Sequence, residues 1–116
     1  MSPAAKSVFT FGFYLSILGI ILVVVPNLIL TIFGLPETEE VWIRVVGVVV
    51  LALAIYYVQL SRKENRDFMW LSVYVRSTVI VFFTAFVLAG YVQPVLILFG
   101  AIDLLGALWT WRALKQ

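Results

Sequence analysis

One apolar stretch, Phe68 to Ala89, carries a full positive charge well inside it, at Arg76. A bilayer core of about 30 Å needs roughly 20 mostly apolar helical residues, and this stretch is long enough to supply them. At about 1.5 Å per residue, Arg76 lies roughly 13 Å beyond Asp67. The guanidinium keeps its proton in proteins and a charge at that depth is costly, so the side chain is expected to face a partner inside a helix bundle.

The predicted partner of Arg76 is Asp103, an acid within another apolar stretch. It follows Pro94 by nine residues, which places it roughly 13 Å from the opposite face of the bilayer. In an antiparallel hairpin the two residues then lie at almost the same height, so an intramembrane Arg76–Asp103 ion pair is predicted. Such a pair is compatible with two interpretations, a functional site or a device that fixes which helix faces meet.

Four apolar stretches together predict an all-α integral membrane protein, an antiparallel bundle of four transmembrane helices. The chain has 116 residues, of which 64% are hydrophobic and 12% charged, a balance outside the range of soluble domains. A single membrane domain over residues 1–116 is expected, with helices at about 8–33, 40–60, 68–89 and 92–112. Short connections make successive helices antiparallel neighbours.

Small residues and one proline shape the first two predicted helices. Gly12, Ser16 and Gly19 follow one another at i, i+4 and i+7, a narrow face that permits close helix approach. Pro26 is expected to bend the first helix near its far end. In the second helix Arg44 lies four residues after Glu40, an order that allows local neutralisation of its charge.

The distribution of basic residues predicts the orientation in the membrane. Six of them fall on the side of the two termini and the middle loop, and the two opposite loops have none. By the positive-inside rule the termini are cytoplasmic and the protein is a multi-pass protein of the cytoplasmic membrane. The six are Lys6, Arg62, Lys63, Arg66, Arg112 and Lys115.

The sequence contains neither cysteine nor histidine, which excludes thiol redox chemistry and removes the usual zinc and haem ligands. No catalytic motif, metal cluster or cofactor signature is present, and the net charge of +2 does not indicate nucleic-acid binding. The leading hypothesis is a non-catalytic membrane protein, either an accessory or structural subunit or a binder of a lipid-like molecule. The alternative is a small oligomeric transporter or channel that uses Arg76 and Asp103.

Partners expected on this basis are the lipid bilayer, a second copy or another protein, and a lipid-like or anionic small molecule. Polar residues that could line a binding site occur in two groups. Those nearer the predicted outer face are Asn27, Glu40 and Arg44, and those nearer the opposite ends of their helices are Tyr56, Gln59 and Tyr74.

Three short motifs carry a resemblance to a family. They are Trp42-x-Arg44-x-x-Gly47, a lone Arg76 in the third stretch, and Asp103-x-x-Gly106-Ala107 in the fourth. In this pattern the whole chain resembles uncharacterised small bacterial four-helix membrane proteins of the DoxX-like type. The resemblance implies the four-span topology and little about activity, and the cysteines of redox-linked members are missing here.

Overall fold

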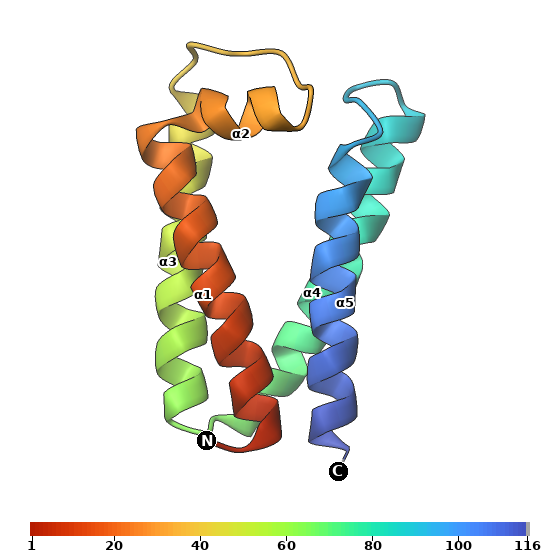
Figure 1. Cartoon of the computed structure of the whole chain (residues 1–116). Helices are drawn as coiled ribbons and strands as arrows, with labels where there is room; N and C mark the ends of the chain where they lie inside the picture. The colour runs from red at the N-terminus through yellow and green to blue at the C-terminus, as the bar shows by residue number, and fades with distance from the viewer. Residues whose placement is uncertain (116) are drawn as a thin grey trace. The chain divides into compact units, whose positions relative to one another are not determined.

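A computed structural model describes residues 1–115, which form five helices and no strand (Figure 1). The residues group into two compact units, one made of Phe9–Gln59 and the other of Met1–Val8 with the residues from Leu60 onward. The helices are α1 (Pro3–Val24), α2 (Pro26–Ile32), α3 (Trp42–Arg62), α4 (Arg66–Leu88) and α5 (Leu96–Leu114).

Four of the helices are long and apolar enough to cross a membrane. They are α1, α3, α4 and α5, with 22, 21, 23 and 19 residues and mean hydropathies of 2.3, 2.1, 1.9 and 1.4. The predicted all-helical class is therefore confirmed, as is the number of apolar helices of spanning length. The chief difference lies in the first predicted helix, over residues 8–33, which the structure divides into α1 and α2.

A break at Val25 separates α1 from α2. Proline has no N–H to donate to the carbonyl four residues earlier, and its ring clashes with that carbonyl, so Pro26 cannot continue α1. Val25 takes a non-helical conformation, with φ −136° and ψ 63°, and Pro26 becomes the first residue of α2. In Figure 1, α2 runs across the direction of α1. The predicted bend is thus a complete interruption of the helix.

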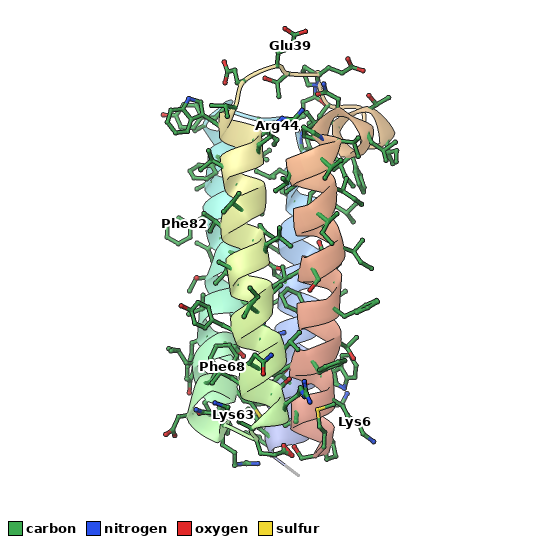
Figure 2. The ribbon with its side chains drawn as sticks, turned by 90° about the vertical axis from the view of Figure 1, so that its left-hand side faces the viewer. Lys6, Glu39, Arg44, Lys63, Phe68 and Phe82 are labelled. Atoms are coloured by element: carbon green, nitrogen blue, oxygen red, sulfur yellow. The ribbon has the colours of Figure 1, made fainter. Side chains whose placement is uncertain are left out.

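Helices α1 and α3 lie side by side within their unit (Figures 1 and 2), and glycines permit the contact. A Cβ added at Gly19 would lie 2.7 Å from Leu51 Cγ and 3.0 Å from the Leu51 backbone nitrogen. On the other helix, a Cβ added at Gly47 would lie 2.8 Å from Val23 Cγ2 and 2.9 Å from the Val23 nitrogen. The small-residue face predicted on the first helix is therefore a packing face, and α3 occupies it.

Helices α4 and α5 form an antiparallel hairpin in the other unit (Figure 1). A Cβ added at Gly100 would lie 2.9 Å from the Ile80 Cα, so the two backbones approach closely there. Two contacts hold the opposite end of this unit. The Ser2 backbone N–H donates to Glu64 Oε1 at 2.6 Å, which lowers the pKa of this exposed carboxyl, and Arg66 Nη2 donates to the Leu114 carbonyl at 3.1 Å.

The α1–α3 contact can be tested at Gly19. We expect Gly19→Ile to lower the free energy of unfolding by about 1–3 kcal/mol, because the added side chain meets the backbone of Leu51. Thermal denaturation in a mild detergent would measure the change. Ala52→Ile, on an exposed position of α3, is the matched control and should change the melting temperature little. Equal melting temperatures for the two variants would contradict the contact.

Candidate functional site

The charge of Arg76 lies on the buried face of α4. The buried residues of this helix, Met69, Ser72, Val73 and Arg76, follow one another at helical spacing and form one face. Arg76 is only 2% exposed. The side chain of Arg76 is therefore buried among other residues of its unit.

Hydroxyl groups of α4, α5 and the first turns of α1 form a polar cluster with the guanidinium. Arg76 Nη2 donates to Thr110 Oγ1 at 2.9 Å and to Ser72 Oγ at 3.1 Å, and Nε donates to the Ser72 carbonyl at 3.2 Å. Thr110 Oγ1 lies 2.7 Å from Ser7 Oγ, in the first turns of α1. We call these four residues, Ser7, Ser72, Arg76 and Thr110, the guanidinium cluster. All are at least 97% buried.

The hydrogen bonds of the cluster all run in one donor-to-acceptor direction, away from Arg76. Ser7 Oγ donates to the Ala4 carbonyl at 2.7 Å, which uses its only hydrogen. Thr110 must then donate to Ser7, and its oxygen accepts from Arg76. Ser72 Oγ donates in turn to the Met69 carbonyl at 2.7 Å, so it too accepts from Arg76. Ser72 and Thr110 therefore both present an oxygen to the guanidinium, as charge-assisted hydrogen bonds require.

Asp103 lies at the backbone height that the sequence predicts, and the hydrogen bonds described above join Arg76 to Ser72 and Thr110. Arg76 is ten residues beyond the start of α4 and Asp103 eleven residues before the end of α5, so both lie roughly 15 Å from the same end of the hairpin. Side chains on a helix tilt toward its N-terminus, and the two N-termini are at opposite ends. Asp103 is partly buried and lies close enough to Arg76 for the two opposite charges to attract each other. Their ion pair stays a prediction.

The sequence interpretation missed Ser7 and Thr110. Thr110 lies seven residues after Asp103, on the same face of α5. The tilt of Arg76 toward the start of α4 indicates this position, which is nearer the end of the hairpin than Asp103. No comparable signal marks Ser7, because its place beside Thr110 depends on how the first turns of α1 pack in the fold. A hydroxyl near one end of an apolar helix is by itself unremarkable.

Arg44 and Asn27 satisfy backbone groups near the break between α1 and α2. Arg44 Nη1 donates to the carbonyl of Val23 and, at 3.3 Å, to that of Val24, at the end of α1. Asn27 Oδ1 accepts from the Thr38 backbone N–H at 2.9 Å. Figure 2 shows Arg44 close to this end of α1, with Glu39 at the tip of the loop beyond it.

The remaining predicted site residues lie on exposed positions. Glu40 precedes α3, which begins at Trp42, so it lacks the helical i,i+4 relation to Arg44 that the sequence suggested. Tyr56, Gln59 and Tyr74 are exposed, and Tyr74 lies on a different face of α4 from Arg76. The structure therefore gathers Arg76 with hydroxyl groups and leaves the tyrosines and Gln59 on the outside of the helices.

Chemically, the guanidinium cluster offers a permanent positive charge and oriented hydroxyl groups. Within residues 1–115, no group of three or more acidic, cysteine or histidine residues is placed to hold a metal ion. No protein-family model, curated protein or solved structure matches this chain. Its function must therefore be inferred from its own geometry.

Thr110 provides the test of the cluster. We expect Thr110→Val to lower the free energy of unfolding by about 1–3 kcal/mol, because a buried guanidinium donor loses its acceptor while the side-chain volume is nearly kept. Thr78→Val is the matched control, since Thr78 is exposed and bonds only the Val75 carbonyl of its own helix. Thermal denaturation of both variants in the same detergent would measure the difference. A Thr110→Val melting temperature equal to that of the control would contradict the inferred role.

Proposed function

We propose that this protein is a multi-pass protein of the cytoplasmic membrane with a non-catalytic, accessory or structural role, and that Arg76 serves its architecture. The observation that carries the proposal is the hydrogen bonding of the guanidinium to Ser72 and Thr110, with Thr110 against Ser7. These bonds join α4, α5 and the first turns of α1. A charge held in this way is suited to fixing which helix faces meet.

The exposed surface of the long helices supports the membrane location. Large apolar side chains such as Phe82, Leu88 and Leu105 are 60%, 83% and 66% exposed. Figure 2 shows Phe82 directed away from the ribbon. A water-soluble protein would bury such side chains, whereas lipid solvates them without penalty.

The charges at the ends of the helices support the proposed orientation. Lys6 lies in the first turns of α1, and basic residues occur between α3 and α4 and in the last turn of α5. The segment after α2 carries three acidic residues, and residues 89–95, which connect α4 to α5, carry no charge. By the positive-inside rule the α3–α4 connection is cytoplasmic. The resemblance to DoxX-like proteins agrees with this topology and remains part of the proposal.

The orientation can be tested directly because the chain has no native cysteine. Single cysteines would be introduced as Glu39→Cys and Lys63→Cys, both on exposed segments. In intact bacterial cells a membrane-impermeant maleimide should label the cysteine at position 39, and the one at position 63 only after permeabilisation. The reverse pattern would overturn the proposed orientation, and recovery of the protein in the soluble fraction would overturn the membrane location.

An architectural role also predicts that water does not reach the cluster. Ala107 lies between Asp103 and Thr110 and is 0% exposed, so Ala107→Cys should resist a small charged methanethiosulfonate reagent in the membrane. Lys63→Cys in permeabilised cells is the reactive control. Protection by at least about tenfold relative to this control is expected, since thiolate formation requires water. Comparable labelling rates would favour the transporter or channel alternative, which needs a wet path to Arg76 and Asp103.

A further inference from the structure

A groove of about 540 Å³ runs along the last turns of α5, in the unit that contains α4 and α5. Leu105, Leu108, Trp109 and Arg112 form one stripe at i, i+3, i+4 and i+7, about 10 Å long. The three apolar members are 46–66% exposed. The complete lining is Pro3, Leu105, Leu108, Trp109, Arg112 and Ala113. The groove is thus apolar along most of its length and charged near one end.

The cation of this groove, Arg112, is available for a ligand. Its side chain is exposed and, among the residues that the structure describes, donates to no carboxylate or carbonyl oxygen. Arg66 and Arg76, in contrast, donate hydrogen bonds within the same unit. A guanidinium presents a planar fork of donors that fits two oxygens of a phosphate group.

The surroundings of Arg112 favour an anion. Cations at this end of the unit outnumber acids, and one of the acids, Glu64, already accepts hydrogen bonds from Ser2. Figure 2 shows Lys6 and Lys63 at the same end. The charges from the α3–α4 connection and the end of α5 are Arg62, Lys63, Arg66, Arg112 and Lys115, against Glu64 and Asp67.

From these observations we infer that the groove binds an anionic phospholipid. The phosphate contacts Arg112, Trp109 lies at the level of the headgroup, and an acyl chain follows Leu108 and Leu105 toward the bilayer centre. The charged end of the groove matches the phosphate of a phospholipid, and its apolar length matches an acyl chain. In the proposed orientation the charged end lies at the cytoplasmic leaflet, where anionic lipids are found. The inference rests on the proposed membrane location and orientation, and it is independent of the role of Arg76.

Native mass spectrometry of the full chain in a mild non-ionic detergent would test the inference. The probes are phosphatidylglycerol and phosphatidylcholine with identical acyl chains. We expect one phosphatidylglycerol to bind several-fold more tightly than phosphatidylcholine. Arg112→Gln should raise the Kd for phosphatidylglycerol about tenfold, the effect expected for the loss of one charge-assisted contact.

Two further variants distinguish binding in the groove from a general attraction of anionic lipid to positive charge. Arg62→Gln removes the same charge from an exposed position that does not line the groove, and it should change the Kd less than about threefold. Ala113→Phe keeps the charge and fills the groove, so it should weaken both lipids, with an unchanged melting temperature as its folding control.

Three results would overturn the inference. They are equal effects of Arg112→Gln and Arg62→Gln, full competition by inorganic phosphate, and a dimer that forms without lipid and is lost with Ala113→Phe. The first would mean that binding depends on net charge alone. The second would mean that the ligand is held without the apolar groove, and the third that the groove is an interface between two copies of the chain. Failure of the membrane location itself would appear separately, in the cysteine labelling.

Discussion

The burial of a guanidinium that cannot lose its proton is the constraint on which the α4–α5 unit depends. A buried cation requires oriented acceptors, and Ser72 and Thr110 supply them. Those short side chains can act only where the helices approach closely. Gly100, whose added Cβ would lie 2.9 Å from the Ile80 backbone, and the fully buried Ala107 permit that approach. The polar cluster and the small residues of α5 therefore serve the same contact.

A second arginine meets the opposite requirement. The break before Pro26 leaves carbonyl groups at the end of α1 without donors from a continuing helix, and a carbonyl without a partner is costly in an apolar environment. Arg44 donates to the carbonyls of Val23 and Val24. In α4 a cation is buried and needs acceptors, whereas at the break the acceptors need a donor. Both arginines donate hydrogen bonds to groups of the protein itself, Arg44 to backbone carbonyls and Arg76 to hydroxyl and carbonyl oxygens.

Arg112 differs from these two because it is exposed and lies beside an apolar groove. A guanidinium that already donates to protein groups has less capacity for a ligand, so burial and hydrogen bonding separate architectural arginines from those available for recognition. This contrast explains why the proposed lipid site is on α5, although the deepest charge, the most conspicuous feature of the sequence, is on α4. It also separates the structural role proposed for Arg76 from the binding role inferred for Arg112.

The amino-acid sequence was sufficient to predict the helical class, four apolar helices of spanning length and the small-residue packing face of α1. These follow from hydrophobic run length and from helical spacing, which are local properties. Three features required the folded chain. Pro26 breaks the helix, Glu40 lies outside α3, and Arg76 bonds Thr110 and, through it, Ser7. The sequence predicted that Arg76 and Asp103 lie at one height because each residue adds the same rise along a helix axis. The direction of a long side chain depends on which acceptors its neighbours present, and those neighbours come from distant parts of the chain.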